Sequence, residues 1–244
     1  MAQILGESTK FLEKQHGRHK RISTAAMLFV VFISGIIAAF TLDYAFKNMG
    51  FWQKLALFIL VFAFYFAIAW LFLLIYSKKK YQSDKYASGI SGEQIIFEEL
   101  KKLPDTYWLL PDISFGQGNV DFIAVSAKGV FVIEAKNHGG TITLEHGELL
   151  HDQKPFERNI LAQSLRQSYA VKDYLAKVRI QAKVIPILVF ANPSARLGLI
   201  KQDTKGVTVL HQKDLLGFIQ NYSAQNKVEA PHYLASLLSK LKKL

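Results

Sequence analysis

The sequence predicts an α/β fold in which a mixed β-sheet is flanked by helices and is preceded by a hairpin of two transmembrane helices. Two charge-free apolar stretches stand near the N-terminus, Ala25 to Leu42 and Leu55 to Ser77. From residue 88 onward, helical and strand periodicities alternate along the chain. Their order is helix, strands, helix, strand, strand, helix, which is typical of helices packed around one sheet.

Each apolar stretch is long enough to cross a membrane, because a hydrocarbon core of ~30 Å needs about 20 residues at ~1.5 Å per residue. The first follows a basic N-terminus, as a secretory signal peptide does. No clear small-x-small cleavage site precedes the following loop, and a second apolar stretch comes at once. We therefore expect a helical hairpin that stays in the membrane.

The charged flanks predict the orientation of this hairpin. Lys and Arg gather in residues 1–21 and directly after residue 77, whereas the connecting loop holds only Lys47 and Lys54. The positive-inside rule then places both termini and the soluble part in the cytoplasm, at a bacterial-type inner membrane. The absence of Cys fits a reducing compartment. The expected divisions are a basic N-terminus (1–21), a transmembrane hairpin (22–77), a polar linker (78–87), the main domain (88–222) and a C-terminal amphipathic helix (223–244).

Charge in the soluble part indicates what it contacts. Residues 78–244 hold 23 Lys and Arg against 16 Asp and Glu, a net charge of +7. Such a basic domain suits a polyanion and equally suits an anionic lipid surface.

The elements of the soluble part follow from local patterns. A helix over 91–103 has Ser91 as a cap and stops at Pro104. The final helix, from Pro231, carries a leucine stripe that suits core packing or a membrane surface. Between these helices we expect a strand at 108–115, a turn at 116–118, hairpins within 119–136 and 138–151, a helix at 157–178, strands at 183–191 and 207–210, and a helix at 212–222.

The hairpin at 119–136 carries two acids and a lysine among apolar residues. With its turn at Ala127 and Lys128, Asp121 lies opposite Glu134, with Cβ atoms ~4.5–5.5 Å apart. A bulge at Gly129 would make the two acids diagonal neighbours instead. Lys136 shares a face with Glu134, because strand residues two apart point the same way.

Two acids facing each other on a sheet are destabilising, and a shared divalent cation removes that penalty. Oxygen ligands favour Mg²⁺ or Mn²⁺. Such an ion lowers the pKa of a water molecule bound to it. Lys136 can orient that water or stabilise charge in the transition state. The alternative is a solvated salt bridge between Glu134 and Lys136, which the apolar flanks disfavour. The hairpin therefore predicts a metal-dependent hydrolytic site.

Three stretches resemble the nuclease-related domain (NERD) family, a branch of the PD-(D/E)xK nuclease superfamily. They are GEQIIFEELKKLP (92–104), NVDFIAVSAKGVFVIEAKNHGG (119–140) and NILAQSLRQ (159–167). The resemblance extends over roughly residues 88–216 and implies a restriction-endonuclease-like fold with nuclease activity. It implies five site residues, of which the first three are the metal ligands: Glu93, Asp121, Glu134, Lys136 and Gln163.

One position departs from the family's usual N-P-x-x-Q pattern, because Ile160 replaces the proline. Asn159 and Gln163 still share a helix face at i,i+4. Simpler roles stay open for three residues. Glu93 also suits the first turn of a helix, Gln163 also suits a solvent-facing position, and we favour Asn159 as a helix cap.

Other candidates carry weaker patterns. The spacing of His138, His146 and His151 matches no zinc motif, so a solvated loop is expected. Gly116 and Gly118 lack the sequence of a phosphate-binding loop and suit a turn. For the aromatic residues Tyr107, Trp108 and Phe115 we expect core packing rather than stacking on bases.

These inferences predict a membrane-anchored, cytoplasm-facing nuclease that hydrolyses phosphodiester bonds with Mg²⁺ or Mn²⁺. Its expected partners are nucleic acid, DNA foremost, and the lipid bilayer, and self-association to a homo-oligomer is left open. The first alternative is a catalytically silent module of the same fold that binds nucleic acid or a protein. The second is a membrane hairpin that assembles with a partner, although its charge-free spans give little support to transport.

Overall fold

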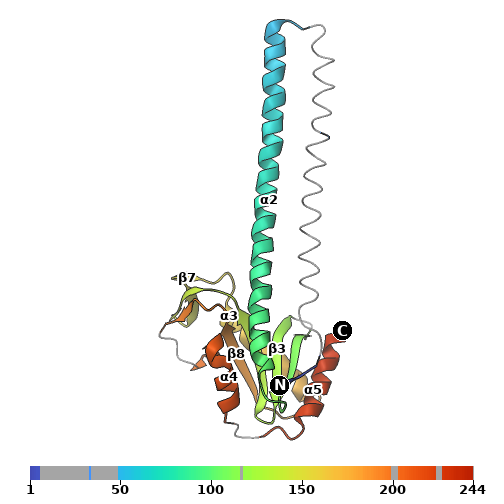
Figure 1. Cartoon of the computed structure of the whole chain (residues 1–244), viewed down its shortest axis with the longest axis vertical. Helices are drawn as coiled ribbons and strands as arrows, with labels where there is room; N and C mark the ends of the chain where they lie inside the picture. The colour runs from blue at the N-terminus through green and yellow to red at the C-terminus, as the bar shows by residue number, and fades with distance from the viewer. Residues whose placement is uncertain (6–32, 34–48, 116–117, 199–202, 224–226, 244) are drawn as a thin grey trace. The chain divides into compact units, whose positions relative to one another are not determined.

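The computed structural model describes residues 1–5, 33, 49–115, 118–198, 203–223 and 227–243 (Figure 1). The chain divides into two compact units. Unit 1 comprises residues 1–10 and 88–244, and unit 2 comprises residues 11–87.

A seven-stranded mixed sheet forms the centre of unit 1, in the order β1-β2-β3-β4-β8-β11-β10. Strands β2, β3 and β4 pair antiparallel, whereas β8 lies parallel to both β4 and β11. This confirms the predicted mixed sheet. The strands are β1 (Gln3–Ile4), β2 (Trp108–Ser114), β3 (Asn119–Ser126), β4 (Gly129–Lys136), β8 (Val184–Phe190), β10 (Asp203–Thr204) and β11 (Val207–His211).

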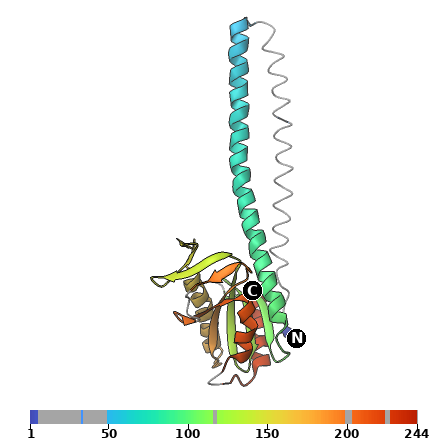
Figure 2. The ribbon, with the colours of Figure 1, turned by 60° about the vertical axis from the view of Figure 1, so that its left-hand side comes forward.

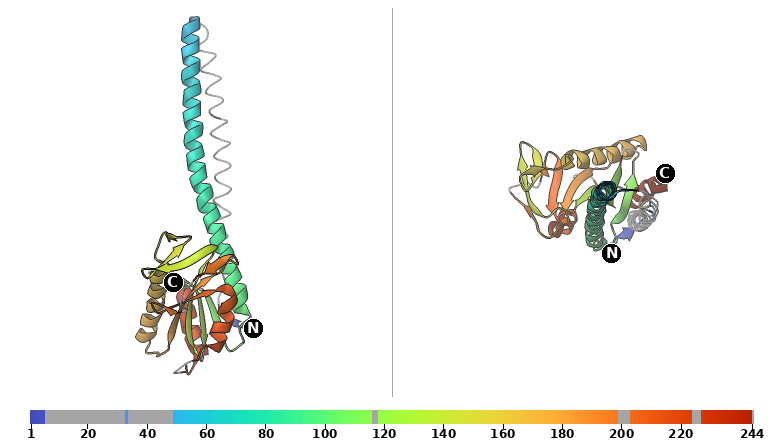
Figure 3. Two further views of the ribbon diagram at one scale, coloured as in Figure 1. Left: turned by 90° about the vertical axis from the view of Figure 1, so that its left-hand side faces the viewer. Right: turned by 90° about the horizontal axis from the view of Figure 1, so that it is seen from above.

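Helices cover both faces of this sheet, as the right-hand view of Figure 3 shows. On one face, the end of α2 and helix α4 bury their apolar side chains against Phe122 and Phe131. On the other face, α3 and α5 pack against Ile123 and Val132. The alternation of strand residues between the two faces explains why each hairpin strand is apolar almost throughout. The helices are α2 (Phe51–Lys101), α3 (Ile160–Lys177), α4 (Gln212–Asn221), α5 (Pro231–Ser239) and the 3₁₀ turn η1 (Lys240–Lys243).

A second, four-stranded sheet lies at one end of unit 1, where Figure 2 shows its yellow strands. Its order is β7-β6-β5-β9, and Ile142 and Leu149 pack it onto the start of α3. The predicted second hairpin is therefore confirmed as β5 and β6. The strands are β5 (Gly140–Glu145), β6 (Glu148–His151), β7 (Lys154–Pro155) and β9 (Ala195–Leu197).

The predicted start of the first helix of the domain is wrong. Helix α2 runs without a break through residues 78–87, the expected polar linker, and through Ser91, which is therefore inside a helix and caps nothing. The reason lies in the sequence, because no proline interrupts residues 51–101 and only a few polar residues separate the two patterns.

Helices α3 and α5 bury different kinds of side chain against the sheet. In α3, Ser164 and Ser168 are buried, whereas Tyr169 is 56% exposed. The small serines let α3 lie close to the sheet, and the Ser168 hydroxyl donates to the Ser164 carbonyl at 2.9 Å. In α5, Leu234 and Leu238 are buried in the core, so the leucine stripe packs onto β2 and β3.

The predicted transmembrane hairpin is not confirmed. The first expected span, 25–42, lies outside the described residues except for Ile33. In the described part, one helix is long and apolar enough to cross a membrane by length and composition. Its window Phe51–Ile68 has a mean hydropathy of 1.9 and contains no buried residue.

Candidate active site

The hairpin of β3 and β4 adopts the predicted register. Val125 pairs with Val130 and Phe122 with Ile133, and no bulge intervenes at Gly129. The same register, continued by one residue, sets Asp121 opposite Glu134. The local cause is the two-residue turn at Ala127 and Lys128 between two alternating apolar strands.

Asp121 also faces an acid on its other side. Strand β2 pairs with β3 through Pro111 and Phe122 and again through Ile113 and Val120. The register between these pairs sets Asp112 opposite Asp121. Acids therefore occupy one level of three neighbouring strands, β2, β3 and β4, a clustering that a sheet disfavours unless the charge is compensated.

Glu134 is the buried acid of the site, with 2% of its surface exposed in the middle of the sheet. Three side chains donate to its carboxylate. The Lys136 ammonium contacts Oε1, to which the Gln163 amide also donates at 2.5 Å. The Gln167 amide donates to Oε2 at 2.6 Å. Such a set of donors offsets the cost of burying a carboxylate.

Asp121 is held by the backbone of the neighbouring strand. Its Oδ2 accepts a hydrogen bond from the Ala135 amide at 2.8 Å. Burial raises the pKa of the Asp121 carboxyl well above its usual range, and the charges of Glu134 and Glu93 raise it further. The Ala135 hydrogen bond and the Lys136 charge act in the opposite direction.

Glu93 enters the site from the last part of α2. Burial raises its pKa from 4.5 to about 7, with further contributions from the charges of Asp112 and Glu134, while Lys136 lowers it. The preceding glycine allows this approach, since a Cβ at Gly92 would lie 2.6 Å from the Asn137 Cβ. The close contact between α2 and the end of β4 therefore brings Glu93 to the hairpin.

All five predicted site residues thus lie in one electrostatic and hydrogen-bonded cluster. Asn159 takes the role that we favoured, because its side chain accepts from the Ala162 amide at 2.9 Å and caps α3. Gln163 lies at the site rather than in solvent, because α3 begins at the level where β4 ends.

Sequence reasoning missed two residues, Gln167 and Asp112. Gln167 lies one helical turn after Gln163, so its i+4 spacing was the available signal. Its amide also donates to the Asn119 carbonyl at 2.8 Å and so ties α3 to β3. Asp112 has a positive φ of 54° and accepts from the Asn119 amide group at 2.8 Å. An acid inside the apolar strand 108–115 was its only signal.

The oxygen atoms around Asp121 and Glu134 suit a hard divalent cation in chemical type. One further observation fits, because the Gln167 Oε1 atom is buried and accepts no hydrogen bond from the described residues. However, the described residues contain no group of three His, Cys, Asp or Glu side chains placed so that they could hold a metal ion together. The arrangement therefore offers two close carboxylates and a free amide oxygen rather than a completed three-acid site.

The histidine candidates form part of a small aromatic cluster at the second sheet. The rings of His138 and His151 lie 5.3 Å apart, and both contact Phe156. His151 Nε2 lies 2.7 Å from the Gly139 carbonyl oxygen. Both histidines are half-buried, so only His146 matches the expected solvated loop. The predicted packing of aromatic residues holds for Tyr107, which is buried in the core.

Residues 88–191 match the nuclease-related domain (NERD) family. The matched range contains the β3–β4 hairpin, the part of α2 that carries Glu93 and all of α3, and therefore every residue of the cluster described above. The NERD match indicates a nuclease-related function, of the hydrolase type. No curated protein and no solved structure matches the chain.

Proposed function

We propose that this protein is a membrane-anchored, metal-dependent nuclease that hydrolyses phosphodiester bonds of nucleic acid, DNA foremost, on the cytoplasmic side of a bacterial-type inner membrane. The observation that carries the proposal is the convergence of Asp121, Glu134 and Lys136 within the NERD-matched segment. The basic soluble part adds sequence-independent attraction for a phosphate backbone.

Asp121 and Glu134 would hold Mg²⁺ or Mn²⁺, with Glu93 as a third acid close by. The raised pKa values of Asp121 and Glu93 are compatible with this, because burial raises both, neighbouring acids raise them further, and a nearby cation would compensate the charge of those acids. When bound, the ion would supply a water of lowered pKa and neutralise charge at the phosphate.

The remaining chemistry falls to the chain's own side chains. Lys136 stands beside Glu134, where its ammonium can orient the attacking water and stabilise the extra negative charge that develops on the phosphate. Gln163 and Gln167 fix the Glu134 carboxylate from two directions. Their role is to hold the ligand in place, because a preorganised ligand loses no energy to rearrangement during the reaction.

Two observations support the membrane anchor. The described apolar helix exposes large side chains, among them Phe62, Phe64 and Trp70, each more than half exposed. In addition, unit 1 contains residues on both sides of residues 11–87, because β1 pairs with β2. A chain that leaves a unit and returns to it crosses a membrane an even number of times, which favours two spans.

The test is a cleavage assay with the full chain, using labelled single- and double-stranded DNA and RNA with Mg²⁺, Mn²⁺ or EDTA. We expect metal-dependent cleavage by the parent and a loss of about 10²–10³-fold for Lys136→Ala and for Asp121→Asn. The exposed Lys213→Ala serves as a control and should retain the parental rate. Equal rates for the parent and Lys136→Ala would exclude the assigned chemistry.

A second candidate function is a catalytically silent nuclease-fold module that binds nucleic acid or a protein at the membrane. It is favoured by the three donors that already occupy the Glu134 carboxylate and by the lack of a three-acid metal group among the described residues. The same assay separates the two functions, because binding of oligonucleotides without cleavage under any metal would support this candidate.

A further inference from the structure

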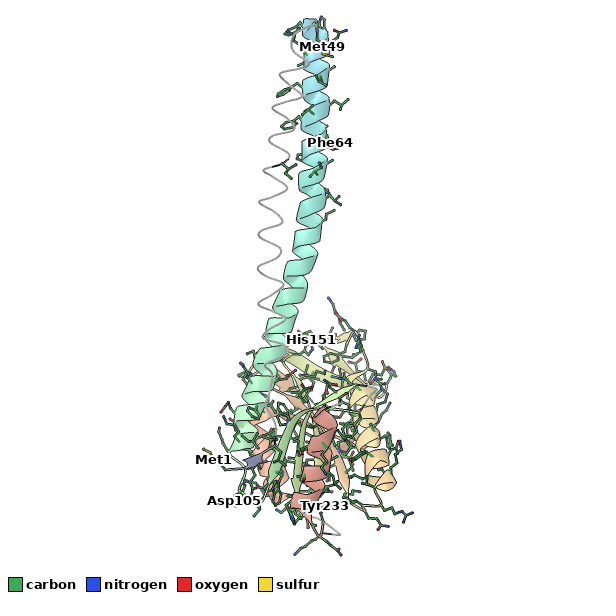
Figure 4. All side chains as sticks on the ribbon, turned by 90° about the vertical axis from the view of Figure 1, so that its right-hand side faces the viewer. Met1, Met49, Phe64, Asp105, His151 and Tyr233 are labelled. Carbon is green, nitrogen blue, oxygen red and sulfur yellow. The ribbon has the colours of Figure 1, made fainter. Side chains whose placement is uncertain are left out.

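A large cleft opens in unit 1 at a distance from the candidate active site. Its volume is about 1400 Å³, and its walls come from the end of α3, the approach to β8 and the segment before α5. Gln163 and Gln167 lie near the start of α3, whereas the cleft lies at its other end. In Figure 4, Tyr233, which lines the cleft, lies near one end of unit 1, and His151, which belongs to the second sheet, lies near the opposite end.

Cationic side chains dominate the walls of this cleft. Lys172, Arg179, Lys183 and Lys227 line it together with a single acid, Glu229. All five are exposed, and none of the four cations forms an ion pair with another described residue. Uncompensated cations that surround a concave surface attract an anionic ligand more strongly than the same charges on a flat surface.

Arg179 occupies a backbone position that favours glycine. It follows the C-cap of α3, where the Ile180 amide donates to the Leu175 carbonyl at 2.9 Å and the Arg179 amide to the Ala176 carbonyl at 3.0 Å. These two bonds define a Schellman motif, and Arg179 has the positive φ of 58° that its C′ position requires. Arginine there is less favourable than glycine, so the side chain is the feature that needs an explanation.

The cleft also offers an aromatic surface beside its charges. Tyr233 lines it with 56% of the side chain exposed. Cations that contact phosphates next to an aromatic ring that can stack on a base are the combination found in nucleic-acid grooves. A phosphodiester chain therefore fits the cleft better than an isolated small anion does.

We propose that the cleft binds the phosphate backbone of the nucleic-acid substrate several nucleotides away from the bond that is cut. This inference rests on the proposed function and adds a second contact to it. From Gln163 to Lys177 the helix rises ~21 Å, at ~1.5 Å per residue. At ~3.4 Å per nucleotide this corresponds to about six nucleotides. A nucleic acid held at the active site therefore reaches the cleft only if it extends about this far from the bond that is cut.

The test measures binding of fluorescent DNA to the full chain in EDTA, in a neutral detergent and over a range of salt concentrations. The cleft variant is Arg179→Glu/Lys183→Glu. Its matched control, Lys102→Glu/Lys213→Glu, makes the same change in net charge on exposed residues elsewhere. A second cleft variant, Arg179→Gln/Lys183→Gln, removes the charges without reversing them, and thermal unfolding verifies that each protein is folded.

For a probe of about 20 nucleotides, we expect the cleft variant to bind about tenfold more weakly or worse at ~0.1 M salt. The slope of log K against log salt should become shallower by about 1.4–1.8, since each lost phosphate contact removes about 0.7–0.9. The control should change by less than about threefold.

Equal weakening by the cleft variant and its control would overturn the proposal, as would parental affinity in both cleft variants. Short-chain phosphatidylglycerol is titrated in parallel. If the cleft substitutions weaken binding of the lipid and not of the oligonucleotide, the cleft is a lipid site and the proposal fails. If the parent binds DNA in this way but never cleaves it, the cleft proposal stands and the proposed nuclease activity fails. If the cleft variant cleaves DNA at the parental rate, the nuclease activity stands and the cleft proposal fails.

Discussion

At the scale of single residues, the hydrogen bonds to the Glu134 carboxylate matter most for the candidate site. Its carboxylate is buried in the sheet and receives donors from Lys136, Gln163 and Gln167. A buried carboxylate that loses one donor keeps the full cost of its desolvation. The amide groups of α3 are therefore as important to the site as the acids of the hairpin.

Gln167→Leu should destabilise the protein by about 1–3 kcal/mol, because Glu134 Oε2 and the Asn119 carbonyl both lose their donor. Urea unfolding measures the change. Gln220→Leu, an exposed position on α4, provides the control and should stay within about 0.5 kcal/mol of the parent. If both variants unfold at the same urea concentration, the amide does not support Glu134.

The pKa of Glu93 predicts how stability depends on pH in the absence of divalent metal. The folded pKa of about 7 exceeds the ordinary value of 4.5, so the folded state keeps a proton that the unfolded state releases. The stabilising effect is complete below about pH 4.5 and is lost as the pH rises through about 7. Glu93→Gln should therefore gain stability relative to the parent between pH 5 and pH 8.

Thermal unfolding of both proteins in EDTA measures this difference. Asp121 remains in both proteins, but Glu93→Gln removes one of the charges that raise its pKa, so the comparison reports the two carboxyls together. Added Mg²⁺ should reduce the difference, because a cation compensates the same charge. A difference between the two melting temperatures that does not vary with pH would contradict the assignment of this carboxyl.

At the scale of single residues, the sequence predicts those side-chain positions that are set by neighbours along the chain. The period of two in the strands and the short turn place Asp121, Glu134 and Lys136 together without any knowledge of the fold. Gln167 and Asp112 were missed because their roles depend on how α3 is rotated against the sheet and on a local backbone conformation at φ 54°.

At the scale of the elements, the β3–β4 hairpin is the structure that sets the site geometry. The turn between its two strands is followed by Gly129, which has a φ of 143° and lies against the start of β8. A Cβ there would come within 2.9 Å of the Lys183 carbonyl oxygen. The absence of a side chain at Gly129 therefore permits the close pairing of β4 with its parallel neighbour.

Gly129→Ala should lower the free energy of unfolding by more than about 1 kcal/mol, through both backbone strain and collision with Lys183. Gly118→Ala separates the two effects. Gly118 has a similar φ of 146° but no atom within 4 Å of the added Cβ, so its replacement should cost less. Denaturant unfolding of the two variants measures the comparison, and an equal loss would exclude the collision.

Elements were predicted well where a pattern spans many residues and poorly where it does not. The strands at 108–115, 119–136 and 183–191 have long apolar patterns, and all of them form. Strand β1 contains only Gln3 and Ile4, too few residues for any pattern, and it exists because the Tyr107 and Leu109 carbonyls accept from Gln3 and Leu5. The helix start at Ser91 failed because capping residues also occur inside helices.

At the scale of the whole molecule, the proposed membrane anchor makes a prediction about topology. Unit 1 includes residues before and after the apolar segment, so a membrane anchor would leave both on the same side of the membrane. The connection between the two expected spans, near Met49, then lies on the opposite side. The chain contains no Cys, so single cysteines can report each location separately.

Met49→Cys should react with a membrane-impermeant maleimide added to intact spheroplasts. Thr106→Cys, an exposed position in unit 1, should react only after the membrane is opened. Parental nuclease activity or thermal stability in both variants ensures that the substitutions are tolerated. Labelling of both cysteines from the same side of the intact membrane would contradict a two-span anchor.

Binding of Mn²⁺ to the full chain tests most directly whether Asp121 and Glu134 share one divalent ion. Paramagnetic resonance of free Mn²⁺, titrated with protein, reports the amount bound without any need for cleavage. We predict one site per chain in the parent and in the exposed control Asp203→Asn. Asp121→Asn should weaken that site by about tenfold or more. Equal binding by Asp121→Asn and the parent would contradict the account.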